Sequence, residues 1–248
     1  MSCFPRRVVG CLLVLFLVTA SVSGYAQSNG SNDAVFQVST LSALFRGVYD
    51  GAMTCGELKK RGDFGIGTLE GLDGEMVILD GKVYQAKVDG NVLTVGDEAL
   101  TPFAVVAFFA ADNKLSLESI DNFDSLQQNL EKVLSTRNIF YAFRIDGTFS
   151  YIKTRSVPKQ EKPYRPVVQT VRETEDIKGT MVGFWCPGYA RGINAPGFHF
   201  HFISDDRRIG GHVLDCRLVA GTAQVKYLTE LNLVMPSTEG FWRANLPK

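Results

Sequence analysis

The chain of 248 residues has no excess of either charge and few cysteines. Lysine plus arginine and aspartate plus glutamate both number 26, so no nucleic-acid partner is expected. A disulfide framework is also excluded, because only Cys55, Cys186 and Cys216 lie beyond the first 26 residues. A single bridge among these three, or a nucleophilic thiol that borrows a histidine, is left open.

Nucleotide-binding motifs are absent as well. The sequence contains neither Gly-x-x-x-x-Gly-Lys-Ser/Thr nor Gly-x-Gly-x-x-Gly, so no nucleotide cofactor is expected. Helices and strands do not alternate along the chain, which argues against a parallel sheet.

The longest apolar run lies at the N-terminus. Val8 to Thr19 follows the cationic Arg6 and Arg7 and precedes small residues that end at Ala26, the pattern of a secretory signal peptide. The run is shorter than the about 20 residues that cross a membrane, which favours cleavage over an uncleaved anchor. We therefore interpret residues 1–26 as a signal peptide and 27–33 as a polar leader. The mature protein is expected to be exported, to the periplasm or outside the cell, and not to bind a membrane.

Histidine is scarce, but all three histidines lie within fourteen residues, at His199, His201 and His212. Alternate side chains of a strand share a face, so the first two point to one side and the intervening phenylalanines to the other. Turn-forming residues at 204–206 and 210–211 predict that the chain doubles back and brings the third histidine onto a neighbouring strand. Three imidazoles with a fourth position open are typical of a catalytic Zn²⁺ or similar divalent metal. The alternative is three unrelated polar side chains on a solvated strand.

Local patterns predict an α+β fold with mostly antiparallel strands. Strands are expected at 34–38, 67–69, 75–79, 82–88, 92–95 and 103–109, with Asp-Gly pairs at 73–74, 80–81 and 89–90 as hairpin turns. Helices are expected at 41–48, at 54–60 behind a capping box of Thr54 and Glu57, and at 124–134. A further hairpin, 138–145 with 148–157, is expected to turn at Asp146-Gly147.

Prolines at 158, 163 and 166 mark a boundary after this hairpin. The mature chain is therefore divided into an N-terminal α+β half, 34–157, and a C-terminal β-rich half, 158–248, that carries the metal site. The second half contains Gly179-Thr-Met-Val-Gly183, which is similar to Gly67-Thr-Leu-Glu-Gly71 in the first. This repeat hints at two similar halves that arose by duplication.

An open metal site needs a group that moves protons and a cation that holds an anionic substrate. Periodicity does not choose among the candidates, which are Glu57, Glu70, Glu75, Asp205 and Asp215 with Arg144, Arg155, Arg207 and Arg217. From local sequence alone, Glu75 is expected to be a surface acid beside a turn, and Arg155 a solvated strand residue.

Ordered motifs along the mature chain narrow this choice. They are Thr40-Leu-Ser-Ala-Leu44, Gly47-Val-Tyr-Asp-Gly51, Gly62-Asp-Phe-Gly65, Leu72-Asp-Gly-Glu-Met76, Arg137-Asn-Ile-Phe-Tyr-Ala142, Arg144-Ile-Asp-Gly147, Gln160-Glu-Lys-Pro-Tyr164, His199-Phe-His-Phe202 and Gly210-Gly-His212. Together they resemble the acetolactate decarboxylase family. The resemblance implies two similar α+β halves, one bound Zn²⁺, and conversion of 2-acetolactate to (R)-acetoin with loss of CO₂.

The resemblance also assigns the site. The family's metal ligands fall on His199, His201 and His212, its glutamate on Glu75 and its arginine on Arg155. Zn²⁺ bound to the ketone and hydroxyl oxygens of the substrate can stabilise an enediolate after CO₂ leaves. The arginine is then expected to hold the carboxylate or polarise the ketone, and the glutamate to protonate one face of the enediolate.

One family feature has no counterpart: a C-terminal tail that returns a second glutamate to the metal. Glu239 is the only late carboxylate, and it does not match that motif. The alternative interpretations are a cupin-like metal oxygenase or isomerase, and an exported metal-binding module without catalysis. A homodimer is one option for the assembly, which the sequence does not decide.

Overall fold

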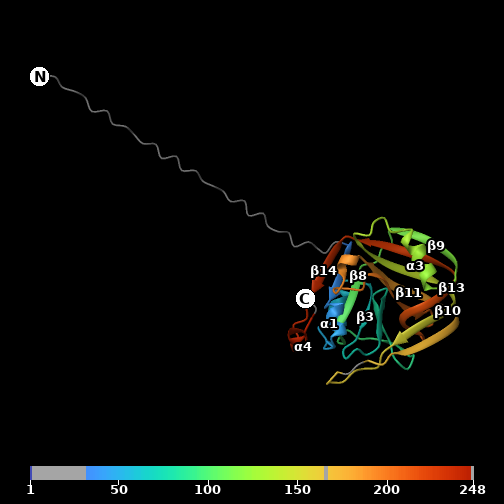
Figure 1. Cartoon of the computed structure of the whole chain (residues 1–248), viewed down its shortest axis with the longest axis horizontal. Coiled ribbons are helices and arrows are strands. Elements are labelled where there is room, and N and C mark those ends of the chain that lie inside the picture. The colour runs from blue at the N-terminus through green and yellow to red at the C-terminus, as the bar shows by residue number, and fades with distance from the viewer. Residues whose placement is uncertain (2–31, 165–166, 247–248) are drawn as a thin grey trace.

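The computed structural model describes residues 32–164 and 167–246, together with Met1. The predicted signal peptide after Met1, positions 27–31 of the leader, and Pro166 lie outside the described residues. Strands dominate the described part and its helices are short (Figure 1), which confirms the expected α+β class with mostly antiparallel sheets. None of these helices combines the length and the hydropathy that a membrane-crossing helix needs.

The secondary structure of the described residues comprises fourteen strands, four α-helices and one 3₁₀ turn. The strands are β1 (Ala34–Val38), β2 (Met53–Thr54), β3 (Phe64–Thr68), β4 (Glu75–Leu79), β5 (Lys82–Ala86), β6 (Val92–Thr94), β7 (Leu100–Thr101), β8 (Phe103–Ala107), β9 (Asn113–Ile120), β10 (Phe140–Ser156), β11 (Thr170–Cys186), β12 (Gly197–Ser204), β13 (Gly210–Leu228) and β14 (Glu230–Val234). The helical segments are α1 (Leu41–Phe45), α2 (Cys55–Lys59), α3 (Phe123–Glu131), α4 (Glu239–Arg243) and the 3₁₀ turn η1 (Gly188–Ala190).

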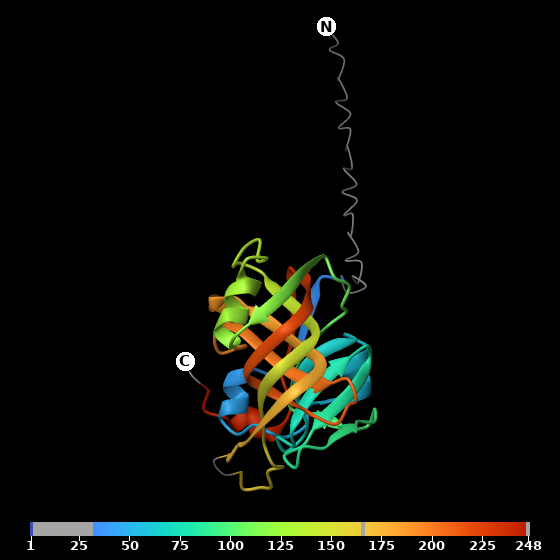
Figure 2. The same cartoon turned by 90° about the vertical axis from the view of Figure 1, so that its right-hand side faces the viewer.

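Two main sheets form the molecule. The first has seven strands in the order β14-β1-β8-β3-β4-β5-β6, and only β14 runs parallel to its neighbour. The second has the order β10-β11-β12-β13-β9, and β10 also pairs with β13. Strands β10 to β13 therefore close into a ring, and β9 extends it along β13. Figure 2 shows these strands crossing the centre of the view, with α3 on one side and the cyan strands of the seven-stranded sheet on the other.

The apolar core has three parts, because each strand sends alternate side chains to opposite faces. One cluster lies inside the ring and beneath α3, and includes Phe200 and Phe202. A second lies between the two sheets and includes Val77 and Phe184. The third covers the other face of the seven-stranded sheet, where Leu58 of α2 is fully buried. The intersheet layer also holds the histidine cluster described below.

The hairpin predicted at Asp146-Gly147 is wrong. β10 continues through both residues, which pair with β11 on one side and β13 on the other. The glycine permits close packing and not a turn, because a Cβ at position 147 would lie 2.6 Å from Leu218 Cδ1 and 2.9 Å from the carbonyl oxygen of Ala220. Asp146 is satisfied inside the strand, where its carboxylate accepts a hydrogen bond from Arg144 Nε at 2.8 Å.

Other local predictions hold in part, since of the three Asp-Gly pairs only Asp80-Gly81 has positive φ at both residues. Asp80 and Gly81 have φ values of 52° and 73° between the paired β4 and β5, as a type I′ turn requires. Thr54 and Glu57 form the predicted capping box. The helix predicted at 41–48 is shorter, since α1 ends at Phe45 and a glycine with φ of 80° follows at position 47.

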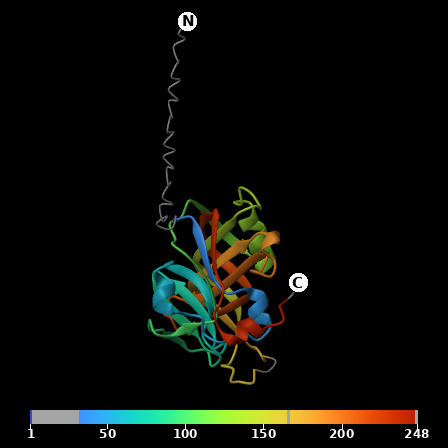
Figure 3. The same ribbon diagram turned by 90° about the vertical axis from the view of Figure 1, so that its left-hand side faces the viewer.

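The two sheets do not divide the chain at position 157. β9 and β10 of the predicted N-terminal half belong to the second sheet, while β14 of the predicted C-terminal half belongs to the first. β14 pairs with β1, so the first and last described strands lie side by side, blue and red in Figure 3. The origin of two halves by duplication stays a prediction.

Candidate metal centre

The histidines occupy the places that their spacing predicts. His199 and His201 lie on β12 and His212 lies on β13. Because Phe200 and Phe202 enter the ring, the first two histidines face the seven-stranded sheet. The turn after β12 places His212 opposite His201 in the β12–β13 ladder.

The three imidazoles form a tight group. Their ring centroids are 4.8, 5.2 and 5.4 Å apart, and one nitrogen from each ring lies within 4.8 Å of the others. His199 Nε2 is 3.0 Å from His212 Nδ1. His201 Nδ1 is 2.7 Å from the carbonyl oxygen of Met76 on β4, to which it donates. That hydrogen bond selects the tautomer in which His201 Nε2 is free to bind a metal.

The electrostatics of the group also suit a cation. Burial, with the nearby Arg155, lowers the pKa of His199 to about 4. Burial and the neighbouring His199 hold the pKa values of His201 and His212 below the usual range. All three rings are therefore neutral near pH 7, the form that binds metals. His199 Nδ1 is buried without a hydrogen-bond partner among the described residues, and coordination of a cation would offset that cost. The residues present thus fit a divalent metal.

Glu75 is buried and Arg155 is partly buried, contrary to the solvated positions expected from local sequence. Glu75 is only 6% exposed, and its Oε1 accepts a hydrogen bond from Arg155 Nη1 at 2.9 Å. Its Oε2 lies 3.4 Å from His201 Nε2. Arg155 stands opposite His212 in the β10–β13 ladder. A row of three side chains therefore crosses β12, β13 and β10, and the glutamate of β4 completes it from the other sheet.

The loop that precedes β4 is fixed by the segment that follows β10. The N–H of Gly74 donates to the carbonyl of Val157 at 3.1 Å, and the N–H of Gln160 donates to the carbonyl of Gly71 at 2.6 Å. These bonds connect the chain just before the carboxylate to the chain just after the guanidinium. They explain why two residues from different sheets meet at hydrogen-bonding distance.

Burial raises the pKa of the Glu75 carboxyl to about 7, because lost hydration outweighs the attraction of Arg155. A carboxyl that titrates near neutral pH can both hold and release a proton. That property suits a general acid or base.

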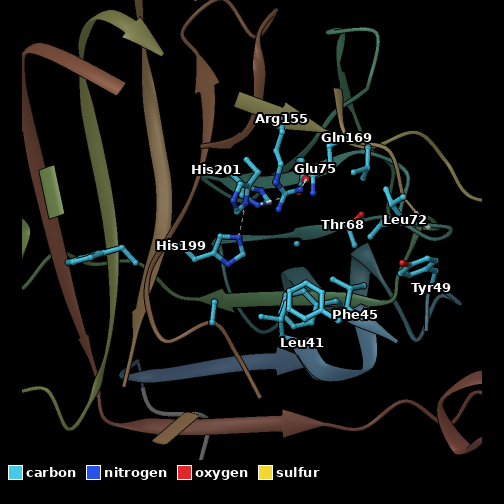
Figure 4. A pocket seen from close by; sticks show the side chains of 18 residues that line it. Leu41, Phe45, Tyr49, Thr68, Leu72, Glu75, Arg155, Gln169, His199 and His201 are labelled. Atoms are coloured by element: carbon cyan, nitrogen blue, oxygen red, sulfur yellow. Dashed lines mark hydrogen bonds and ion pairs between the residues drawn. The ribbon is translucent and has the colours of Figure 1, made fainter. Parts of the chain in front are cut away.

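All five predicted site residues line one cavity of about 540 Å³. In Figure 4 His199, His201, Arg155 and Glu75 gather at one end, and side chains of α1 and of the β3–β4 loop line part of the remainder. Sequence reasoning did not single out Tyr49, Leu72 or Gln169, which also line the cavity. The first two lie within the quoted motifs, and this was the only signal that could have found them.

The other candidate acids and cations lie elsewhere. Glu57 completes the capping box of α2, Arg144 pairs with Asp80 and Asp146, and the guanidinium groups of Arg207 and Arg217 stack on tyrosine rings. Residues that do not line the cavity are Glu57, Glu70, Asp205, Asp215, Glu239, Arg144, Arg207 and Arg217. The late carboxylate at position 239 is exposed on α4 and pairs with Arg243 at 2.8 Å.

The three described cysteines are free and buried. The single bridge that the sequence left open therefore does not form among them. Burial raises the pKa of Cys55 to about 11 and those of Cys186 and Cys216 to about 12. Such thiols carry almost no thiolate at neutral pH, which argues against a nucleophilic role.

Comparison with known proteins agrees with this geometry. The sequence profile of the family described as alpha-acetolactate decarboxylase matches residues 35–248. The alpha-acetolactate decarboxylase of Methanosarcina mazei is 46% identical over 224 residues, which cover 88% of this chain and 78% of that protein. The protein of the same name from Bacillus licheniformis is 42% identical over 87% of each chain.

A solved structure agrees too. The crystal structure of alpha-acetolactate decarboxylase from Bacillus subtilis strain 168 superposes with a TM-score of 0.84 at 39% identity, covering 87% of this chain and 94% of that one. These matches favour the decarboxylase over the cupin-like enzyme. The chain belongs to the alpha-acetolactate decarboxylase family.

Proposed function

We propose that this protein decarboxylates 2-acetolactate to (R)-acetoin and CO₂ with one Zn²⁺ held by His199, His201 and His212. The observation that carries the proposal is a neutral three-histidine cluster beside a buried Glu–Arg pair in one cavity. Membership of the alpha-acetolactate decarboxylase family supports 2-acetolactate as the substrate. When bound, the metal would stabilise negative charge that develops on the substrate oxygens.

Arg155 would bind the anionic end of the substrate. Its side chain is 22% exposed and lines the cavity, and its Nη1 donates to Glu75 at 2.9 Å. The remaining donors of its planar fork suit a carboxylate or a polarised ketone. Opposite His212 on the adjacent strand, the guanidinium would orient the substrate against the histidine group.

Glu75 would supply the proton that replaces the departing carboxylate. When the C–C bond to the carboxylate breaks, its electron pair stays on the carbon next to the ketone as an enediolate. A protonated Glu75, held by Arg155 at 2.9 Å and lying beside the metal-binding His201, would deliver a proton to one face only. The net change is loss of CO₂ and gain of one proton, which gives acetoin of a single handedness.

The experiment follows acetoin formed from racemic acetolactate, with chiral chromatography of the product and elemental analysis of the protein. About one Zn²⁺ per chain and an excess of the (R) product are expected. No acetoin above the rate without enzyme would reject the decarboxylase. Activity that tracks iron and not zinc would reject the metal assignment.

Export and assembly are proposed on separate grounds. The pattern of residues 1–26 supports a cleaved signal peptide, so mature protein beginning near position 27 is expected in the periplasm or the medium. Finding only full-length protein in the cytosol would contradict export. A homodimer is the assembly to test by light scattering.

A further inference from the structure

The cavity is much larger than a five-carbon acid requires. Its volume is about 540 Å³, and cavities of roughly 300–1,000 Å³ enclose drug-sized ligands. The groups that the proposed reaction uses are confined to one end (Figure 4). None of the other described residues that line the cavity carries a charged side chain.

The rest of the cavity is mostly apolar. Leu41, Leu44 and Phe45 contribute one side from α1, at the i, i+3 and i+4 spacing that places side chains on one helix face. Leu72 and Tyr49 line it as well. A substrate that ended at methyl groups would leave much of this surface in contact with water.

Phe45 supports an apolar occupant. The ring lines the cavity and yet remains 76% exposed. α1 cannot rotate to bury it, because Leu41 and Leu44 of the same helix pack against the core between the sheets. A ligand group seated beside the ring would remove apolar surface of both from water.

Leu72 supports the same conclusion through its backbone. It has φ of 57°, a left-handed conformation that costs a leucine about 1–2 kcal/mol. The nearby glycines at 71 and 74 also have positive φ, yet a leucine and not a third glycine occupies position 72. The large side chain is instead held toward the cavity, where Figure 4 shows it above Tyr49.

We propose that this site also decarboxylates 2-hydroxy-3-oxo acids that carry a phenyl-sized apolar group on the ketone carbon, where acetolactate has a methyl group. This inference rests on the proposed function. The reaction takes the same course as with acetolactate. The carboxylate leaves as CO₂, its electron pair remains on the hydroxyl-bearing carbon, and one proton is added there. The phenyl group would lie against Phe45 and Leu72, and the reacting carbons would lie by the histidines.

The test uses 2-hydroxy-2-methyl-3-oxo-3-phenylpropanoate beside acetolactate, with the zinc-loaded full-length protein and subtraction of the decarboxylation seen without enzyme. We expect a kcat/KM for the phenyl compound within about tenfold of that for acetolactate, since apolar pockets discriminate weakly. Turnover of acetolactate with none of the phenyl compound would overturn this inference and leave the proposed function intact. Turnover of neither would reject the proposed function itself.

Two variants locate the apolar group. Phe45→Ala should lower the ratio of kcat/KM for the phenyl compound to that for acetolactate by about tenfold, because the phenyl group would no longer have an aromatic ring to shield it from water. Tyr189→Ala is the matched control, because Tyr189 is 68% exposed and does not line the cavity. Its ratio should equal that of the natural protein. An unchanged ratio in Phe45→Ala would overturn the placement of the group against α1.

Discussion

The carboxylate of Glu75 accepts a hydrogen bond at 2.9 Å from the guanidinium of Arg155, 80 positions away in the sequence. The two residues lie on β4 and β10, which belong to different sheets. Their contact therefore forms only when the sheets pack together. It joins the expected proton donor to the cationic side chain that is expected to bind the substrate. Replacing either residue should impair turnover more than folding.

Arg155→Lys should lower kcat/KM roughly 10- to 100-fold, because lysine keeps the charge but loses the planar donor pair. Steady-state kinetics on acetolactate and a thermal melt would measure the two effects. Arg144→Lys is the matched control, since Arg144 lies on the same strand, pairs with two aspartates and does not line the cavity. If kcat/KM fell equally in both variants, Arg155 would have no specific role in the reaction.

Glu75→Gln should lower kcat about 10²- to 10⁴-fold, the usual contribution of a general acid. Metal content should survive, and the acetoin should lose handedness, because solvent protonates either face. Steady-state rates and chiral chromatography of the acetoin measure the two effects. Glu239→Gln is the control, because that exposed carboxylate pairs with Arg243 outside the cavity. A fast and stereospecific Glu75→Gln enzyme would show that the proton comes from another group.

His199→Ala, and the double change with His201→Ala, should abolish stoichiometric metal binding. The natural protein should melt at a lower temperature after chelation, since a metal stabilises the state that binds it. The variants should melt at the same temperature with and without chelator. Elemental analysis supplies the metal content, and full occupancy in the double variant would refute the ligand assignment.

The metal-free protein should become less stable as pH falls from about 6.5 to about 4. Burial lowers the folded-state pKa of His199 to about 4. Between pH 6.5 and 4 this histidine is therefore protonated in the unfolded chain but neutral in the folded chain. The loss is about 3 kcal/mol for this residue. Glu75 acts in the opposite sense, because its folded pKa of about 7 favours the folded state as pH falls.

As pH falls, the loss of stability caused by the three histidines together exceeds the gain caused by the one carboxyl. Urea unfolding across this pH range should therefore show a net loss of stability in acid, and a steeper one in Glu75→Gln. A metal-free His199→Ala variant should show a shallower dependence. A natural protein whose stability rises toward pH 4 would contradict the prediction.

Gly147→Ala should destabilise the protein by about 1–3 kcal/mol, because its Cβ would overlap Leu218 and the backbone of β13. Gly147→Asn should cost at least as much, whereas asparagine would be tolerated if this position were a turn. Denaturant unfolding measures both. Gly96→Ala is the control, since nothing lies within 4 Å of a Cβ there.

The sequence by itself determined the elements whose cause is local. The alternation of histidine and phenylalanine placed the imidazoles on one face of a strand, and the turn residues brought His212 beside them. Asp80-Gly81 and the Thr54–Glu57 capping box were likewise predictable, because the backbone conformation of a turn or a helix start depends on the residues within it.

Only the tertiary structure decided where the remaining groups act. Asp146-Gly147 has the composition of a turn, but neighbouring strands on both sides hold it extended. Glu75 follows a turn and would be a solvated acid, but β10 of the other sheet buries it beside Arg155 and shifts its pKa toward neutrality. Burial and pairing depend on segments distant in sequence, whose contact no local pattern encodes. The resemblance to a family pointed to these two residues, and the packing of the two sheets shows how they come to meet.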